Sequence, residues 1–265
     1  MTTSSTTSPN APTTPDVATL SLEQVLRALS LNHAAQQLDD FSQKAIARAA
    51  PPSWLLDNLM REQLRVSSEH RARLALQRSS IFPLTSIATY DFDYPQSIDR
   101  ELCHRAATLE FLKEKSNIVF IGPSGVGKTH LSNAIGQLAC LQGYRVKFVV
   151  AADLVNGLVA AQAKNSLARC LSAWGSYDLL LIDELGYLSF DSRGADLLYQ
   201  VFNRRYQRNS TIVTTNLPFK DWGKLFSNTA AASAIADRLV HKGLLIRITG
   251  RSRRSDQQID EGENR

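Results

Sequence analysis

Apolar and polar positions alternate in blocks along the second half of the chain. Five short runs are almost wholly apolar, and helical spacing of apolar residues separates them. The runs are NIVFIG (117–122), RVKFVV (145–150), YDLLLID (177–183), STIVTTN (210–216) and GLLIRI (243–248). Strands of this kind are typical of a parallel sheet with helices on both faces. We therefore expect an α/β fold with a five-stranded parallel sheet and helices near 128–142, 151–164, 193–208 and 229–242.

The first eighty residues show mainly helical spacing. A first amphipathic helix is predicted after Ser21, a residue type that caps helix N-termini well. Its apolar stripe is Leu22, Val25, Leu26 and Leu29. A second, short helix carries Leu38, Phe41 and Ile46, and the proline pair at 51–52 ends it.

A third, longer helix is predicted over 53–79. It is expected to bury Trp54, Leu55, Leu59 and Leu64 and to expose an arginine-rich face. The arginines of that face are Arg61, Arg65, Arg71, Arg73 and Arg78.

The chain is predicted to consist of five parts. A disordered Ser/Thr/Pro-rich tail (1–18) precedes a helical N-terminal module (19–80) and an extended linker with aromatic residues (81–96). An α/β domain (97–250), which begins with a helix at 97–115, is followed by a charged C-terminal tail (251–265).

Composition places the chain among ordinary globular proteins. It has 265 residues, of which 43% are hydrophobic and 21% charged. No apolar run approaches the roughly 20 residues that span a bilayer, and the N-terminus lacks the pattern of a secretory signal. Three widely spaced cysteines indicate reduced core thiols, so we expect a cytoplasmic protein without a membrane partner. The net charge of +5 is compatible with a nucleic-acid partner.

A phosphate-binding loop lies between the first predicted strand and its helix. The segment GPSGVGKT (122–129) matches GxxxxGK[ST], in which backbone N–H groups and the helix N-terminus surround phosphate groups. Lys128 is expected to contact the β- and γ-phosphates, and the Thr129 hydroxyl to bind Mg²⁺. The predicted nucleotide contacts are Gly122, Pro123, Ser124, Gly125, Val126, Gly127, Lys128, Thr129 and His130. We expect the His130 ring to pack against the sheet rather than take part in chemistry.

Two adjacent carboxylates end the third apolar run. Asp183 and Glu184 would face the phosphate loop, because the carboxyl ends of parallel strands share one edge of the sheet. Asp183 is expected to hold Mg²⁺ through water, and Glu184 to orient and deprotonate the attacking water. This pair favours hydrolysis of ATP over transfer of its phosphoryl group to a small molecule.

Two further polar residues are candidates for the nucleotide site, and each also has a simple structural explanation. Asn216 ends the run TIVTTN and could contact the γ-phosphate or the attacking water, or could simply cap the strand. Arg238 lies on the predicted helix before the last strand, where spacing alone favours a solvated charge.

The motifs occur together in an order that resembles a known family. They are GPSGVGKTHL (122–131), AADLVNGL (151–158), LLIDELGYL (180–188), TTNLPFKDWGKLF (214–226) and IADRLVHKG (235–243). The chain resembles the IstB-type ATP-binding helper proteins of insertion sequences, which are relatives of the DnaC helicase loaders and the DnaA initiator within the AAA+ superfamily. The resemblance covers residues 81–254, most of the chain.

The resemblance implies a five-stranded AAA+ core, ATP-driven self-assembly on duplex DNA and cooperation with a transposase. It also implies that Arg238 is an arginine finger inserted into the ATP site of a neighbouring subunit. Seventeen residues follow Ile248, too few for the helical lid of many AAA+ proteins. Arg253 stands where the family often has a tyrosine.

Basic residues gather near the C-terminus and are candidates for DNA contact. The candidates are Lys242, Arg247, Arg251, Arg253 and Arg254. Lysine and arginine contacts to phosphate give affinity without reading sequence, so we expect largely sequence-independent binding. A solvated surface cluster is the alternative.

The favoured hypothesis is a Mg²⁺- and ATP-dependent AAA+ ATPase that oligomerises on double-stranded DNA and assists a transposase. A DnaC-like helicase loader is the nearest alternative, because it uses the same core. A small-molecule P-loop kinase and a non-hydrolysing ATP-bound scaffold are less favoured, since the sequence shows no acceptor pocket and retains Asp183 and Glu184.

Overall fold

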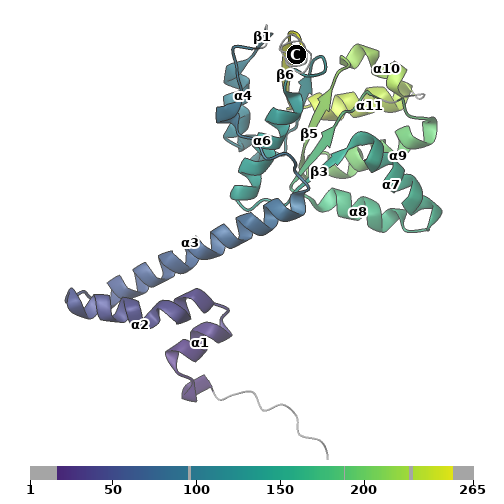
Figure 1. The fold of residues 1–265 in the computed structure, drawn as a ribbon. Helices are drawn as coiled ribbons and strands as arrows, with labels where there is room; N and C mark the ends of the chain where they lie inside the picture. Colours follow the sequence, from purple (N-terminus) through teal and green to yellow (C-terminus); the bar gives the residue numbers. More distant parts are fainter. Residues whose placement is uncertain (1–16, 95–96, 188, 227–228, 253–265) are drawn as a thin grey trace, which may run out of the picture. The chain divides into compact units, whose positions relative to one another are not determined.

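The fold is described from a computed structural model, which describes residues 17–94, 97–187, 189–226 and 229–252. The chain divides into two compact units, Met1–His70 and Arg71–Arg265, and each is described by itself. Figure 1 shows the succession of helices and strands along the chain, coloured by sequence.

The first unit is helical, as the sequence predicts. It contains α1 (Leu22–Ala28), α2 (Asn32–Ala47) and the first part of α3 (Pro52–Ser79). Ser21 caps α1 in a reciprocal capping box with Gln24. The small core of this unit consists of Leu26, Ala34, Ala35 and Leu59. Inside it the side chain of Gln63 accepts a 2.8 Å hydrogen bond from the backbone N–H of Ala34, which satisfies a donor in the first turn of α2.

Two expectations for this unit are wrong. Leu64 was expected to be buried but is 61% exposed, so it does not contribute to the helical core. The second helix is also longer than predicted, at 16 residues. The five arginines assigned to the surface of α3 are exposed, as expected.

The second unit is built on a six-stranded sheet. The strands are β1 (Ser97–Ile98), β2 (Ile118–Ile121), β3 (Val146–Val150), β4 (Leu179–Asp183), β5 (Ser210–Thr215) and β6 (Leu244–Thr249). Their order is β1-β6-β2-β5-β4-β3. The five strands from β2 to β6 pair in parallel, as predicted, and β1 adds a short antiparallel edge that the sequence analysis missed.

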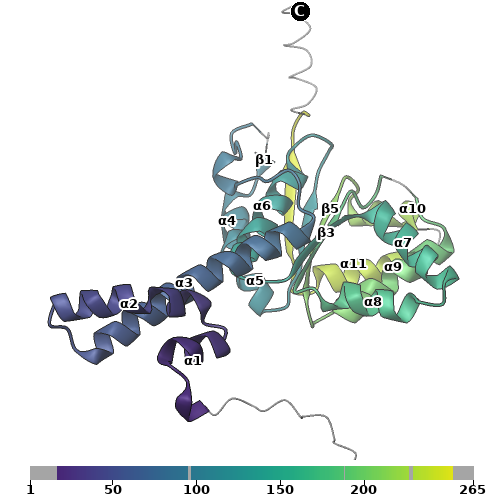
Figure 2. The same ribbon diagram turned by 60° about the horizontal axis from the view of Figure 1, so that its bottom comes forward.

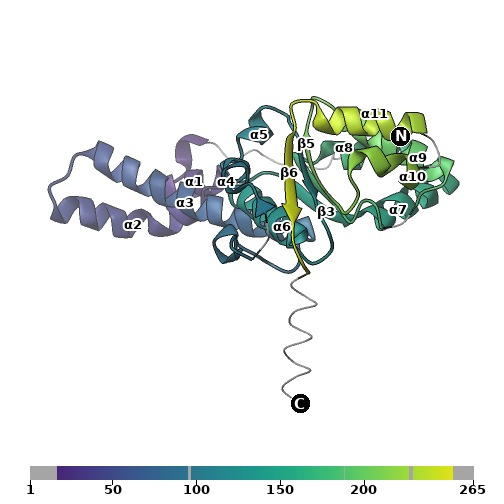
Figure 3. The same cartoon turned by 90° about the horizontal axis from the view of Figure 1, so that it is seen from above.

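Helices cover both faces of this sheet. They are α4 (Arg100–Ala107), α5 (Glu110–Lys113), α6 (Lys128–Leu141), α7 (Ala151–Ala163), α8 (Leu167–Ser176), α9 (Ser192–Arg205), α10 (Trp222–Leu225) and α11 (Thr229–Val240). Figures 2 and 3 show α4, α5 and α6 on one side of the sheet and α7 to α11 on the other. The alternation of strand side chains explains these layers. Ile118 and Phe120 of β2 enter the core beneath α6, whereas Val119 and Ile121 enter the opposite core.

The predicted helix at 97–115 is interrupted. Residues 97–98 form β1, and the Asp99 side chain then caps α4 by accepting a 2.9 Å hydrogen bond from the Leu102 N–H. Leu109 adopts a left-handed conformation with φ of 62°, which separates α4 from α5. Helices α8 and α10 were also not predicted.

A buried arginine of α9 connects the end of α8 to the first residues of β5. Arg205 is 1% exposed and donates hydrogen bonds to the carbonyl oxygens of Trp174, Tyr177 and Ser210 and to the hydroxyl of Thr211. Burial lowers the pKa of this guanidinium to about 9. Its hydrogen bonds tie the chain before β4 to the first residues of β5, the two strands that carry the site residues described below.

The segment before β1 packs onto the rest of the second unit. Ile81 is 6% exposed and lies in the core beneath α6, and Tyr90 and Phe92 pack against the same cluster. The segment therefore contributes to the fold of this unit. Among the described residues, no helix combines the length and apolar character needed to cross a bilayer.

Candidate nucleotide-binding site

The phosphate-binding loop joins β2 to α6, as the sequence predicts. Gly125 and Gly127 have φ values of +78° and +91°, a backbone region that residues with a Cβ atom rarely adopt. Gly127 also lies at the N-cap of α6, so the N–H groups of the first helical turn are directed toward the loop.

The loop is closely surrounded, and this explains its glycines further. A Cβ atom at Gly122 would lie 2.2 Å from the carbonyl oxygen of Ile248 on β6. At Gly127 it would lie 2.4 Å from the Tyr90 ring, whose hydroxyl donates a 2.9 Å hydrogen bond to the Val126 carbonyl. The sheet and the segment before β1 thus hold the loop from two directions.

Lys128 and Thr129 begin α6 beside this loop. The Nζ atom of Lys128 donates a 2.6 Å hydrogen bond to the Pro123 carbonyl, and the residue is only 8% exposed. The Oγ1 atom of Thr129 lies 2.9 Å and 3.0 Å from the two carboxylate oxygens of Asp183. Hydroxyl and carboxylate oxygens are the ligands that Mg²⁺ prefers. The residues present therefore fit a magnesium ion beside the phosphate loop.

Thr214 of β5 fixes the two carboxylate residues. Its hydroxyl donates a hydrogen bond to Asp183 and accepts one of 3.0 Å from the backbone N–H of Glu184. Thr214 is 1% exposed, so this contact is protected from water. The role of Thr214 was not predicted, although a polar residue inside an otherwise apolar strand indicates a hydrogen-bonded group.

Glu184 turns sharply out of β4. It has a φ of 60°, which is uncommon for a residue other than glycine and recurs at functional sites. Its side chain is exposed and lines the cavity beside the phosphate loop. The structure thus brings Glu184 to the same cavity as Lys128 and Thr129, while Asp183 remains buried behind it.

Asn216 lies directly after β5 and lines the same cavity. Its Oδ1 atom is buried and has no hydrogen-bond partner among the described residues. A Cβ atom at Gly186 would lie 2.8 Å from this oxygen, so only glycine leaves room for it. A buried acceptor without a partner is costly, and a bound water or hydroxyl group would satisfy it.

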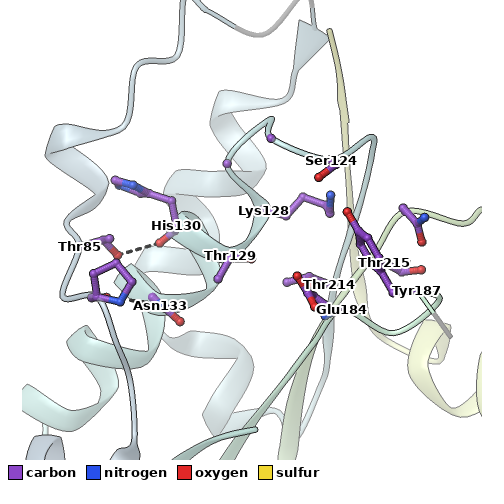
Figure 4. Close-up of a pocket in the computed structure, with 14 residues that line it drawn as sticks. Thr85, Ser124, Lys128, Thr129, His130, Asn133, Glu184, Tyr187, Thr214 and Thr215 are labelled. Carbon is purple, nitrogen blue, oxygen red and sulfur yellow. Dashed lines mark hydrogen bonds between the residues drawn. The ribbon is translucent and has the colours of Figure 1, made fainter. Parts of the chain in front are cut away.

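The cavity has a volume of about 270 Å³. Figure 4 shows Lys128, Ser124 and Tyr187 around one part of it and Thr129 facing Glu184 and Thr214. The full lining is Pro83, Thr85, Ser124, Gly125, Gly127, Lys128, Thr129, His130, Asn133, Glu184, Tyr187, Thr214, Thr215 and Asn216. Pro83, Thr85 and Tyr187 were not predicted as site residues. The first two lie in an extended segment without a motif, and in the motif LLIDELGYL (180–188) only the two carboxylates indicated chemistry.

The expected packing of His130 against the sheet is wrong. Its Nε2 atom lies 2.9 Å from the Ser86 carbonyl, and its ring lies 5.6 Å from that of Tyr90. The Thr85 hydroxyl donates a 2.9 Å hydrogen bond to the His130 carbonyl (Figure 4). His130 therefore fastens the segment before β1 to the first turn of α6.

Arg238 does not line this cavity. It lies near the end of α11 and lines a different cavity of about 230 Å³, together with Lys115, His241 and Lys242. The structure therefore separates Arg238 from the other predicted catalytic residues of the same chain.

The DNA-contact candidates that the structure describes lie in different places. Lys242 precedes β6 and lies beside Arg238, whereas Arg247 lines a cavity that includes Pro123 and Asn216. Arg251 is exposed. Arg253 and Arg254 lie outside the described residues, as do most of the predicted tails at 1–18 and 251–265. Trp222 and Phe226 are 1% and 0% exposed, so they are packing residues.

Comparison with known sequences agrees with these features. The model of a family described as IstB-like ATP binding protein matches residues 24–260. The IS232 putative ATP-binding protein of Bacillus thuringiensis subsp. berliner is 34% identical over 229 residues, 86% of this chain and 92% of the relative. The IS21 putative ATP-binding protein of Pseudomonas aeruginosa is 30% identical over 241 residues, 91% of each chain.

Solved structures show the same fold at lower identity. AMPPCP-bound DnaA from Aquifex aeolicus superposes with a TM-score of 0.55 and 22% identity, over 71% of this chain and 57% of that chain. A structure of DnaI gives a TM-score of 0.52 and 22% identity, over 64% of this chain and 90% of that chain. The phosphate loop, the strand-end carboxylates and the family match lead to one conclusion. The chain belongs to the IstB-like ATP-binding protein family, and its second unit has the P-loop AAA+ fold.

Proposed function

We propose that this protein is a Mg²⁺-dependent ATPase that assembles on duplex DNA and assists a transposase. The observation that carries the proposal is that Glu184 and Asn216 line the same cavity as the phosphate loop. Thr129 lines this cavity too, and its hydroxyl contacts the carboxylate of Asp183. A site that only bound ATP would not need an exposed carboxylate and a buried, unpartnered amide oxygen on the same cavity.

Each residue has a distinct role in hydrolysis. Lys128 and the N–H groups at the start of α6 bind the phosphates and stabilise the charge that develops on them. Glu184 accepts the proton of the attacking water, and the Oδ1 atom of Asn216 holds that water in line. Thr129 and Asp183 would hold Mg²⁺, which neutralises phosphate charge.

Arg238 acts on the ATP site of a second copy. It lines a cavity separate from the phosphate loop of its own chain, so a contribution to hydrolysis requires a neighbour. An arginine placed against the γ-phosphate by a neighbouring subunit couples ATP binding to assembly, and cleavage to ADP releases it.

The DNA and transposase roles rest on family membership and charge. The relatives are proteins of insertion sequences, and this chain carries a net charge of +5. Lys242, Arg247 and Arg251 are exposed and available for phosphate contacts, which are largely independent of sequence. We place the protein in the cytoplasm, on DNA when it is assembled.

Light scattering of the purified full-length protein tests the proposal. The solution mass is measured with and without ATP and a duplex of about 60 base pairs, a length chosen to cover several subunits on DNA at about 3.4 Å per base pair. Glu184→Gln is examined alongside to slow hydrolysis. We expect a large assembly only when both ligands are present, and its loss in Arg238→Ala. A monomer under every condition would contradict the assembly.

A further inference from the structure

Arg238 is held in place by side chains of α9. Its Nη2 atom donates hydrogen bonds of 3.0 Å to the Tyr199 hydroxyl and 3.3 Å to Oδ1 of Asn203. The guanidinium carbon lies 4.8 Å from the centroid of the Tyr199 ring and 5.6 Å from that of Tyr206. Tyr199, Asn203 and Tyr206 are spaced four and three residues apart, so they lie on one face of α9 and its C-cap.

Further contacts restrain both the backbone and the side chain of Arg238. Its carbonyl oxygen accepts a 3.0 Å hydrogen bond from the side chain of Asn117, the residue before β2. Its Nη1 atom donates a 2.9 Å hydrogen bond to the Ala234 carbonyl one turn earlier in α11. The neighbouring Leu239 is 1% exposed, which fixes the rotation of the helix. Both ends of a long and otherwise adaptable side chain are therefore restrained.

One donor of the guanidinium remains unused. The Nε atom of Arg238 is buried and has no hydrogen-bond partner among the described residues. Arg238 also lines a cavity together with three further basic side chains, Lys115, His241 and Lys242, and one acid, Glu114. A charged donor without a partner, in a largely basic cavity, favours binding of an anion.

We propose that Tyr199, Asn203 and Tyr206 are positioning residues that hold the Arg238 guanidinium ready to contact a phosphate of ATP bound to a second copy. The inference rests on the proposed function, because it needs Arg238 to act on a neighbour. The rings and hydrogen bonds restrict the side chain before the neighbour arrives. Less rotamer freedom is then lost when the phosphate is contacted, which speeds hydrolysis without tightening ATP binding.

The alternative is that these contacts only connect α9 to α11. That role would affect unfolding and leave the kinetics unchanged in any variant that folds. The two tyrosines allow the roles to be separated, since the Tyr199 hydroxyl bonds to Arg238 whereas the Tyr206 contact with it is through the ring.

The test is steady-state ATP hydrolysis by the full-length protein with a duplex of about 60 base pairs, with kcat and KM measured separately. Tyr199→Phe removes only the hydroxyl, and Asn203→Ala removes only the amide. For each we expect kcat to fall about ten-fold and KM for ATP to stay unchanged. Tyr206→Phe is the matched control and should keep the wild-type kcat, whereas Tyr206→Ala should lower it.

A double-mutant cycle completes the test. Tyr199→Phe combined with Arg238→Ala should be no slower than Arg238→Ala alone, because the hydroxyl acts only through the arginine. Additive losses, or wild-type kcat in both Tyr199→Phe and Asn203→Ala, would overturn the positioning role. If Arg238→Ala itself hydrolyses ATP at the wild-type rate, the proposed role of Arg238 fails first, and the inference fails with it.

Discussion

The Oγ1 atom of Thr129 lies 2.9 Å and 3.0 Å from the two carboxylate oxygens of Asp183, although 54 residues separate them along the chain. This contact joins the helix after the phosphate loop to the end of β4. It places two oxygen-bearing side chains at one point beside the nucleotide cavity.

Glu184→Gln should abolish most hydrolysis and preserve ATP binding. The amide keeps the size of the side chain and cannot accept a proton, and a general base contributes about 10²- to 10⁴-fold. Phosphate release measures hydrolysis, and the fluorescence of a labelled ATP analogue measures binding. Glu69→Gln on α3 is a matched surface control and should behave as wild type. Turnover that survives unchanged in Glu184→Gln would rule out its role as the base.

Thr214→Val should raise the Mg²⁺ concentration that hydrolysis requires. The hydroxyl of Thr214 bridges Asp183 and the N–H of Glu184, so its loss leaves a buried donor unpaired at a cost of about 1–3 kcal/mol. We expect a higher Mg²⁺ concentration for half-maximal activity and a lower melting temperature. Thr214→Ser retains the hydroxyl and should restore the Mg²⁺ dependence. An identical Mg²⁺ titration for valine and threonine would show that the bridge is dispensable.

Mixing two inactive variants should restore activity if Arg238 acts on a neighbour. Lys128→Ala lacks a functional phosphate loop, and Arg238→Ala lacks the arginine. In a mixed assembly some interfaces combine an intact loop with an intact arginine, so ATP hydrolysis should reappear. The rate is measured as a function of the mixing ratio, with each variant alone as the control. A mixture no more active than its components would place the action of Arg238 within its own chain.

Arg205→Met should destabilise the second unit. The substitution keeps much of the volume but leaves the carbonyls of Trp174, Tyr177 and Ser210 without their donor, at a total cost on the order of 3 kcal/mol. Urea unfolding followed by circular dichroism measures this loss. Arg204→Met is the matched control, because Arg204 is exposed and donates a 3.3 Å hydrogen bond to the side chain of Ser172. Equal midpoints for both variants would show that Arg205 does not fasten the sheet.

The contribution of the two buried thiols to stability should decrease as the pH rises above about 9, whereas the buried Arg205, whose pKa is lowered to about 9, contributes in the opposite direction. Burial raises the pKa of Cys103 to about 12 and that of Cys140 to about 11, both from 9.0. The folded protein therefore retains thiol protons that the unfolded chain releases above pH 9.0. Each protonated thiol contributes fully to the free energy of unfolding below its pKa in the unfolded chain. As the pH rises from there toward the pKa in the folded protein, this contribution falls by about 1.4 kcal/mol per pH unit for each thiol.

Urea unfolding at about pH 8 and about pH 10 measures this dependence, because the interval brackets the unfolded thiol pKa of 9.0. Cys103→Ala should have a smaller difference between the two pH values than the wild type. Cys170→Ala is the control, since Cys170 is only half-buried. If Cys103→Ala shows the same difference as the wild type, the buried thiol does not cause the loss.

Local pattern was sufficient for the phosphate loop and the parallel strands. Glycine spacing between an apolar run and a helical run predicted the loop, and uninterrupted apolar strands predicted burial on both faces. The same rule placed Asp183 and Asn216 at one edge of the sheet, because parallel strands end together. Periodicity failed for Leu64, since an apolar residue at helical spacing still needs a neighbouring element to bury it.

Only the tertiary structure decided which distant side chains meet. The bridge between Thr214 and Asp183 depends on the register of β4 against β5, and no local sequence pattern encodes that register. The contact of His130 with Ser86 depends on the path of a segment without periodicity, because its hydrogen bonds go to α6 and not to a regular neighbour. The contact of Tyr199 with Arg238 requires α9 and α11 to pack side by side on one face of the sheet. The sequence by itself determined the chemistry that was available, and packing determined which groups act together.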